Sequence, residues 1–341
     1  MKKRVTSFDV AKRAGVSRGV VSAVLNNTPG IGVSEEKRRA VLQAIEELNY
    51  VVDVQARGMR TGQSRCIAAY GDLSNPFFSQ MLQGLQKVCN EQGYFVLLCG
   101  SGAGFNDRTA LIDLYMQRRI DGIVTKDSTG FTDPDWEERI GEGRIPYVSV
   151  EGFPDQTGIA SVLMDYSRSI RTALDYAWKQ TKRPPVYVEI YEGAEHRPNW
   201  GDRHRTKAYR EWMETQGLKP RVVLKRFEAW PADKSWWLEL LQAEPGPGRF
   251  LTNWSRGAVQ LYRAANELGL RIGQELHIMA ADNTERINAH LVPSLSAVEV
   301  PYTEMGQAAA QRLIEYIEGA RPPEDTADIW LEARLMARES M

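Results

Sequence analysis

Three basic side chains stand close together in the stretch DVAKRAGVSRGVVSAVLNN, residues 9–27, whose other side chains are mostly small. Arg18 has the clearest chemistry, because an arginine at the start of a helix can donate two parallel hydrogen bonds to guanine O6 and N7. Such a pair is worth about 1–3 kcal/mol of discrimination between bases. Ala23 can contact only a thymine methyl group. These residue types predict a surface that contacts base edges and phosphates of duplex DNA, through Thr6, Ser17, Arg18, Gly19, Ser22, Ala23 and Asn26.

Two short helices must position these side chains. Thr6 and Asp9 form an N-terminal capping pattern, and apolar residues then recur at helical spacing, which predicts a helix over about residues 7–14. Gly15 suits a left-handed turn, and Ser17 suits the cap of a second helix that ends near residue 26 or 27. Helices joined this tightly cross steeply, and small residues at A-x3-G-x5-V spacing, residues 11–21, permit it. The pattern is typical of a helix-turn-helix.

The second helix is predicted to have an apolar face and a solvent-facing side. Its apolar residues are Val20, Val21, Val24 and Leu25, and Arg18, Gly19 and Ala23 are expected to point away from them. Ser34 caps a third predicted helix, whose apolar residues Val41, Leu42, Ile45 and Leu48 are expected to cover the first two. The alternative interpretation is a short helical hairpin with a solvated basic face.

The charge distribution separates a basic head from an acidic body. Residues 1–64 hold 11 Lys/Arg and 6 Asp/Glu, whereas the remaining chain holds 32 and 38. A basic head on an acidic body is typical of a protein that binds a polyanion. At 341 residues the chain is also long enough for two or three domains.

The composition excludes several classes of protein. The hydrophobic fraction of 43% and the charged fraction of 26% are ordinary for a soluble globular protein, and no apolar run approaches the roughly 20 residues of a membrane span. The start, MKKRVTSFDV, lacks the apolar core of a secretory signal, so the expected location is the cytoplasm. The three cysteines lack CxxC spacing, which argues against a disulfide framework or a zinc site. We expect neither a metal nor a cofactor.

The head then resembles a known family. VTSFDVAKRAGVSRGVVSAVLNN followed by NYVVDVQARGMRTGQS is similar to the head and hinge of the lactose-repressor and galactose-repressor family of bacterial transcription regulators. The similarity continues through IAAYGDLSNPFF, RRIDGIVTK, VEVPYTEMGQAAAQRLIE and LMARES. It implies a homodimer that binds near-palindromic double-stranded operator DNA. It also implies a hinge helix that contacts the minor groove through Ala56 and Met59.

Two departures from the family pattern fall in the hinge. Val52 replaces the usual proline, and Gly58 replaces a common serine, so a weaker hinge helix is expected. The alternative is an ordinary flexible linker. The expected domains are therefore a helix-turn-helix domain at residues 1–49, a hinge at residues 50–64, and an effector-binding and dimerisation body at residues 65–341.

Apolar runs alternate with helical stretches throughout the body. The strand-like runs are CIAAYG, YFVLLC, DGIVTK, PYVSV, PVYVEIY, RVVLKR, RFLTN and LHIMAA. This order predicts doubly wound parallel sheets. Family resemblance implies two lobes like those of periplasmic binding proteins. The first lobe covers about residues 65–167 and 299–326, and the second about residues 168–296 and 327–336.

Polar and aromatic residues that follow the apolar runs are the candidate ligand contacts, because ligands of such sheets meet the carboxyl ends of the strands. Positions that also match family contacts are Phe77, Phe78, Glu151, Arg205, which opens a predicted helix, Trp230, Asn253 and Asp282. Aromatic faces with carboxylates and an arginine suit a polyhydroxylated small molecule, so the expected effector is a sugar or sugar derivative.

No catalytic pattern accompanies these residues. CGSGAG lacks both GxGxxG and GK[ST], the four histidines are scattered without ligand spacing, and GxSxG is absent. We therefore expect a ligand-responsive DNA-binding regulator that acts as a repressor, rather than an enzyme. The alternatives are a sugar- or nucleotide-handling enzyme and a transport-type solute-binding protein on the same two-lobed fold.

Overall fold

The chain divides into two units, residues 1–64 and residues 65–341, which we call the head and the body. The computed structural model describes residues 5–26, 32–51, 62–101, 108–155, 158–228, 234–243, 248–283 and 286–341. Among these residues, no helix is both long and apolar enough to cross a membrane.

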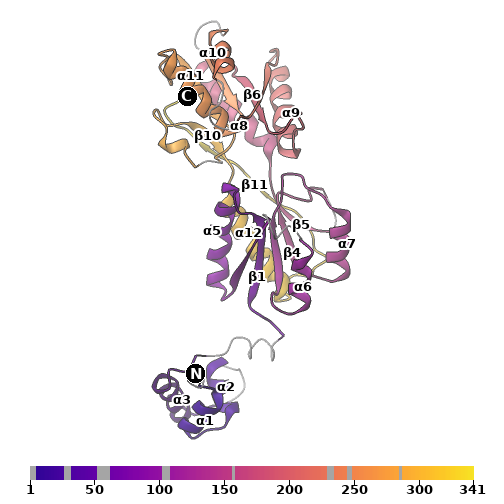
Figure 1. The fold of residues 1–341 in the computed structure, drawn as a ribbon, viewed down its shortest axis with the longest axis vertical. Helices are drawn as coiled ribbons and strands as arrows, with labels where there is room; N and C mark the ends of the chain where they lie inside the picture. Colours follow the sequence, from indigo (N-terminus) through magenta and orange to yellow (C-terminus); the bar gives the residue numbers. More distant parts are fainter. Residues whose placement is uncertain are drawn as a thin grey trace. The chain divides into compact units, whose positions relative to one another are not determined.

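The described part of the head contains three helices, α1 (Ser7–Ala14), α2 (Arg18–Asn26) and α3 (Glu35–Glu47) (Figure 1). The carboxylate of Asp9 accepts hydrogen bonds from the backbone N–H and the hydroxyl of Thr6, at 2.8 and 2.7 Å. Gly15 ends α1 with a φ of 64°, which is the left-handed conformation that favours glycine. The Ser17 hydroxyl accepts from the Val20 N–H at 3.3 Å. The predicted helix-turn-helix is therefore present.

A small apolar core holds the three helices together. Its buried residues are Val10, Ala11, Val21, Val24, Val41 and Ala44. The prediction for Leu42 is wrong, because its residue is 53% exposed and Ala44 takes the inward position on α3. With 100° between successive residues, a helix that turns Val41 and Ala44 inward turns Leu42 outward.

The first lobe of the body is built on a six-stranded parallel sheet with the order β11-β5-β4-β3-β1-β2. Its strands are β1 (Cys66–Asp72), β2 (Phe95–Ser101), β3 (Gly122–Lys126), β4 (Tyr147–Val150), β5 (Ala160–Met164) and β11 (Ile329–Leu331). α5 (Pro76–Glu91) and α12 (Tyr302–Ile317) contribute to the core on one face, and α6 (Ala110–Met116) and α7 (Pro134–Glu142) to that on the other (Figure 1).

The second lobe is built on a sheet with the order β12-β10-β9-β8-β6-β7, in which only the β10–β12 pair is antiparallel. Its strands are β6 (Val186–Tyr191), β7 (Val222–Arg226), β8 (Gly248–Thr252), β9 (Leu276–Ala280), β10 (Ser296–Glu299) and β12 (Arg334–Met336). α8 (Tyr166–Thr181) and α9 (Trp200–Thr215) share a core with one face, and α10 (Ser235–Gln242) and α11 (Ser255–Glu267) with the other.

The predicted fold class is confirmed, and the eight apolar runs correspond to β1–β4 and β6–β9. The prediction that the last segment, residues 327–336, belongs to the second lobe is wrong for β11 and agrees with the pairing of β12. β11 pairs with β5 of the first lobe, and β12 pairs with β10 of the second. Each of these strands has only three residues, which is too short for alternation in the sequence to reveal the crossing.

Two glycines bring α5 and α12 unusually close together. A Cβ at Gly84 would overlap the carbonyl oxygen of Thr303, and a Cβ at Gly306 would overlap that of Met81. Because each glycine faces the backbone of the other helix, the pair lets α12 lie directly on α5 in the first-lobe core.

Candidate functional site

The start of α2 presents an exposed polar surface on the head. Ser17, Arg18 and Gly19 are exposed, as is Thr6 before α1, and Ser22 is half-buried. Arg13 forms an ion pair with Glu47 of α3, at 2.5 Å between Nη2 and Oε2. The basic residues of this stretch therefore divide into one that binds α3 within the head and two, Lys12 and Arg18, whose side chains extend into solvent.

One prediction about this surface is wrong. Ala23 is 4% exposed and does not lie on the solvent-facing side of α2. Its methyl group reaches only a short distance from the helix axis, so neighbouring side chains cover it even on the flank of the apolar face. Asn26 ends α2, and its side chain lies outside the described residues, as do the hinge residues Ala56 and Met59.

A cleft of about 570 Å³ lies at the carboxyl ends of strands from both lobes of the body. The first lobe contributes residues that follow β1, β3 and β4, and the second contributes residues that follow β6, β8 and β9. Its lining residues include Phe77, Lys126, Glu151, Tyr166, Asp202, Arg205, Trp254, Arg256, Asp282 and Tyr302.

Glu151 is the centre of a buried hydrogen-bond network at the first-lobe side of the cleft. Its carboxylate pairs with Lys126 Nζ at 2.7 Å and accepts hydrogen bonds from Tyr302 OH at 3.1 Å, Thr129 Oγ1 at 3.2 Å and Tyr166 OH. Its φ of 71° is unusual for a residue with a side chain. Burial, with the nearby carboxylate of Glu151, raises the pKa of Tyr302 well above its ordinary value, so this hydroxyl is a donor at neutral pH.

Arg205 and Asp202 form the corresponding pair at the second-lobe side. Arg205 Nη1 lies 3.1 Å from Asp202 Oδ1, and Nη2 donates to the Ala281 carbonyl at 3.2 Å. The guanidinium carbon lies 4.4 Å from the centroid of the Tyr166 ring. Burial raises the pKa of Asp202, and the guanidinium opposes that rise. Burial alone would lower the pKa of Arg205, but the Asp202 carboxylate and other groups raise it above its ordinary value.

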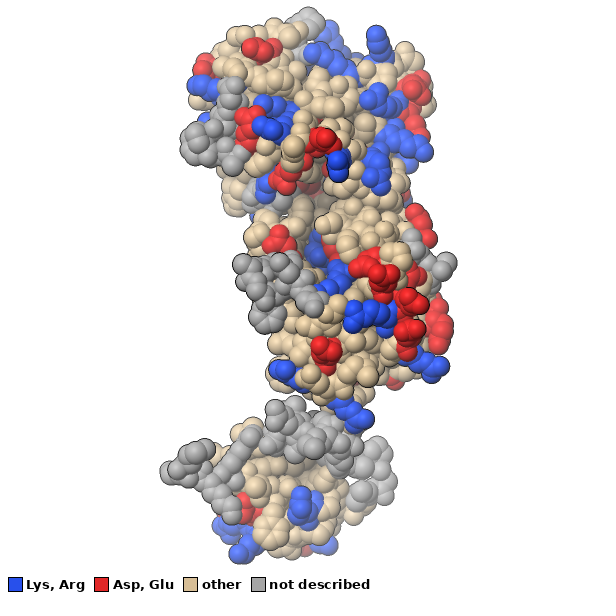
Figure 2. All heavy atoms as spheres, turned by 45° about the vertical axis from the view of Figure 1, so that its right-hand side comes forward, with Lys and Arg blue, Asp and Glu red and all other residues tan. Residues whose placement is uncertain are grey.

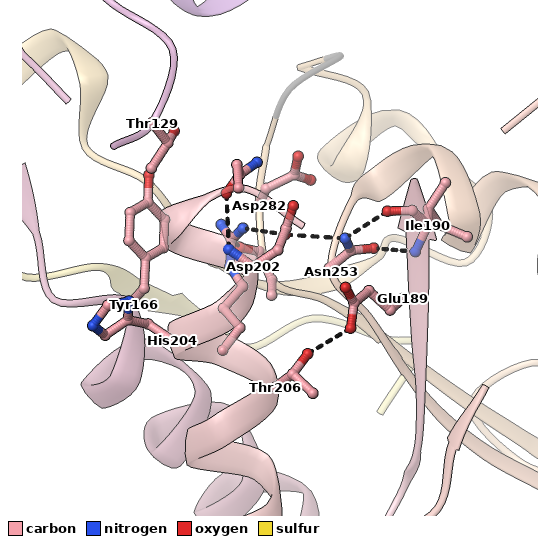
Figure 3. Close-up of polar contacts among 12 residues, drawn as sticks. Thr129, Tyr166, Glu189, Ile190, Asp202, His204, Thr206, Asn253 and Asp282 are labelled. Atoms are coloured by element: carbon pink, nitrogen blue, oxygen red, sulfur yellow. Dashed lines mark hydrogen bonds and ion pairs between the residues drawn. The ribbon is translucent and has the colours of Figure 1, made fainter. Parts of the chain in front are cut away.

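Asn253 holds Asp202 of this pair in place by a hydrogen bond (Figure 3). Its amide donates to Asp202 Oδ1 at 3.1 Å and to the Ile190 carbonyl at 2.9 Å, and its oxygen accepts from the Ile190 N–H at 2.7 Å. The residue is fully buried and does not line the cleft. The prediction that it lines the site is wrong, since these bonds use its amide to hold β6 and α9 together.

The remaining predicted residues are placed as follows. Phe77 lines the cleft and stacks on Tyr302 with ring centroids 4.3 Å apart, whereas Phe78 packs into the first-lobe core against Gly71 and does not line it. Adjacent residues of a helix point about 100° apart, so only one of the two phenylalanines can face the cleft. Arg205 lies in the second turn of α9 rather than its first residue, and Trp230 lies outside the described residues.

Asp282 lines the cleft two residues after the end of β9. Its carboxylate accepts hydrogen bonds from the backbone N–H and the hydroxyl of Ser255, and so caps the start of α11. Cleft residues that were not predicted from the sequence include Lys126, Asp202, Tyr302, Trp254 and Arg256. Lys126 carried a usable signal, because it ends the apolar run DGIVTK. Among the described residues, no group of His, Cys, Asp and Glu is arranged to hold a metal ion.

A helix-turn-helix head joined to a two-lobed body with a polar cleft defines a ligand-responsive DNA-binding regulator. The family model described as bacterial regulatory proteins, lacI family, matches residues 8–53, and that of the periplasmic binding protein-like domain matches residues 175–341. The chain therefore matches the lacI family of bacterial regulatory proteins in its head and is similar to curated repressors over nearly its whole length.

Curated relatives match almost the whole chain. The ribose operon repressor of Halalkalibacterium halodurans is 29% identical over 98% of this chain and 96% of its own length. The HTH-type transcriptional repressor PurR of Proteus mirabilis is 28% identical over the same shares. The catabolite control protein A of Priestia megaterium is 24% identical over 98% of this chain and 99% of its own.

Solved structures show the same fold. The lac repressor dimer bound to operator and an anti-inducer has a TM-score of 0.77, with 22% identity and 99% of each chain covered. The transcriptional regulator CelR in complex with cellobiose has a TM-score of 0.64, with 22% identity, 99% of this chain and 100% of that chain covered.

Proposed function

We propose that this protein is a transcriptional repressor whose affinity for operator DNA is set by a sugar or sugar derivative bound in the cleft. The observation that carries the proposal is the combination, in one chain, of an exposed arginine at the start of α2 and a cleft between two lobes. Relatives named as repressors that match the chain over nearly its whole length support it.

On the DNA side, we propose that two heads of a homodimer bind the two halves of a near-palindromic operator. Arg18 contacts a base edge, and Thr6, Ser17, Gly19, Ser22 and Asn26 lie against the backbone or the groove. The hinge residues Ala56 and Met59 contact the minor groove in this proposal. A protein that regulates bacterial genes works where the chromosome is, in the cytoplasm.

On the effector side, the proposed contacts are Phe77, Glu151, Arg205 and Asp282, together with Trp230. An aromatic ring covers the C–H face of a sugar, and carboxylate and guanidinium groups bind its hydroxyls. The two sites are coupled by linkage. An effector that binds more tightly to the DNA-free arrangement lowers the affinity for DNA, and DNA lowers the affinity for that effector by the same factor. An effector with the opposite preference strengthens DNA binding.

The alternatives are less well supported. A solute-binding protein needs no helix-turn-helix head, and an enzyme needs reactive groups beyond the paired charges of this cleft. The named relatives are repressors, so we propose no catalytic activity. Turnover of a sugar by the purified protein would favour the enzyme instead.

The test is selection of duplexes from a random library by the full-length protein at moderate salt. We expect enrichment of a near-palindromic sequence, and we expect its affinity, measured by fluorescence anisotropy, to change when one sugar of a panel is added. No preference over random competitor DNA, with the panel both present and absent, contradicts the proposal.

A further inference from the structure

Each cation that lines the described part of the cleft already has a carboxylate partner. Lys126 pairs with Glu151 at 2.7 Å and Arg205 with Asp202 at 3.1 Å. The two more exposed arginines are paired as well, Arg256 with Glu192 at 2.9 Å and Arg197 with Glu195 at 2.8 Å. The positive charges of this surface are therefore neutralised before any ligand enters.

The helix N-termini at the cleft are occupied in the same way. Anionic ligands of α/β folds usually bind the free N–H groups at the start of a helix. Here Asn75 Oδ1 accepts from the Phe77 N–H of α5, and Asn199 Oδ1 accepts from the Asp202 N–H of α9, both at 2.9 Å. Asp282 caps α11 through Ser255 and places a negative charge at that end. The N-termini of these helices therefore offer fewer free N–H groups to a phosphate or carboxylate, and the N-terminus of α11 repels it with a negative charge.

The balance of charges in the cleft is slightly acidic. Its lining includes five carboxylates, Asp72, Glu151, Glu192, Asp202 and Asp282, against the four cations. The body residues outside the described ranges contain no lysine or arginine in the sequence. Acidic and basic side chains are also interspersed over the face of the body drawn in Figure 2. No cation that lines the described part of the cleft is thus left over for an anionic ligand.

We infer that the effector is an uncharged polyhydroxylated molecule, and that phosphorylated and carboxylated sugars are rejected. A neutral sugar donates its hydroxyl protons to the carboxylates and stacks on Phe77 or Trp254, whereas an anion would lose its hydration without gaining an unpaired cation. This inference rests on the proposed function and adds the charge of the ligand to it.

The first experiment uses native mass spectrometry of the full-length protein with an equimolar panel. The panel contains aldopentoses, aldohexoses, hexitols and disaccharides of glucose and galactose, together with the 5- or 6-phosphates and the aldonic and uronic acids of the same sugars. We expect the bound mass to be that of an uncharged member, with its charged counterpart bound at least about tenfold more weakly. Equal or tighter binding of a charged member, or binding of no uncharged member, overturns the inference.

A charge-selectivity variant provides a second readout. Glu192→Gln removes the carboxylate partner of Arg256, and the side chain of Glu192 is 59% exposed, so folding is expected to be preserved. We expect the phosphorylated counterpart of the bound sugar to bind about tenfold more tightly to this variant than to the unchanged protein. The control is Glu275→Gln, which makes the same chemical change in the ion pair with Arg271, away from the lining. An unchanged affinity for the phosphate in Glu192→Gln overturns the inference.

DNA binding separates the two proposals. If a phosphorylated sugar proves to control operator affinity, the charge inference fails while the proposed repressor function stands. If the protein selects no duplex at all, the repressor function fails, and the sugar panel still tests the charge preference of the cleft.

Discussion

Lys126 Nζ and Glu151 Oε2 lie 2.7 Å apart at the cleft, and their side chains are only 5% and 1% exposed. Lys126 ends β3 and Glu151 directly follows the neighbouring strand β4, and the register of the two strands pairs Lys126 with Val150. The same carboxylate accepts hydrogen bonds from Tyr166 and Tyr302, the first residues of α8 and α12. Glu151 therefore connects the cleft to two of the segments that cross between the lobes.

Glu151→Gln should destabilise the protein by about 3–5 kcal/mol, because it leaves the buried ammonium of Lys126 without its counter-charge. Urea unfolding of the full-length protein measures the change. The double variant Lys126→Met with Glu151→Gln is the control, since it removes both charges and should recover much of the loss. A single variant as stable as the unchanged protein would show that the pair contributes little.

Gly306→Ala should destabilise the first lobe by about 1–3 kcal/mol, because the added methyl group forces α12 away from the Met81 backbone. Thermal unfolding measures the effect. Gly141→Ala in α7 is the matched control: the same substitution there meets nothing within 4 Å, and alanine is the better helix former. Equal stabilities of the two variants would mean that the helices separate at no cost.

Arg18→Ala should reduce discrimination at one base pair in each half-site by about 1–3 kcal/mol, because the bidentate contact to guanine is lost. Selection from a random duplex library, followed by sequencing, measures the preference at each position. Arg18→Lys is the control, since it keeps the charge but cannot form the planar fork. If both variants keep the original preference, Arg18 does not read a base.

Asn253→Ala should lower stability by about 1–3 kcal/mol, because the N–H and the carbonyl of Ile190 lose their partner in a buried site. Chemical unfolding measures that loss. A stable Asn253→Ala protein with no effector response would show that Asn253 is an effector contact.

Asp282→Asn should instead abolish the response of DNA binding to the effector while sparing DNA affinity. Fluorescence anisotropy with and without sugar measures that response.

Stability should fall as the pH drops below about 6.5, the ordinary pKa of histidine, in part through His277. Burial, followed by the nearby charge of Arg249, lowers the pKa of His277 in the folded state. The folded protein therefore binds fewer protons at this residue than the unfolded chain, so the stability present above pH 6.5 is lost as the pH falls. His277→Asn should lose less stability between pH 7.5 and pH 5.5 in urea unfolding. The same change at the exposed His290 is the control.

Much of the architecture could be predicted because its signals are local. Caps and a left-handed glycine mark α1 and α2 within a few residues, and long apolar runs mark eight strands. The three-residue strands β11 and β12 escaped prediction, since their pairing depends on the other sheet strands rather than on their own pattern.

The sequence by itself determined the helix-turn-helix, the alternating α/β order of the body and the strand ends at which ligand contacts fall. Each depends on residues close together in the chain. Only the tertiary structure decided which polar residues face the cleft. Asn253 and Asp282 both follow a strand, but α9 covers the first while the second lines the cleft. Lys126 and Glu151 are 25 positions apart in the sequence, and their pairing exists only because β3 and β4 end side by side.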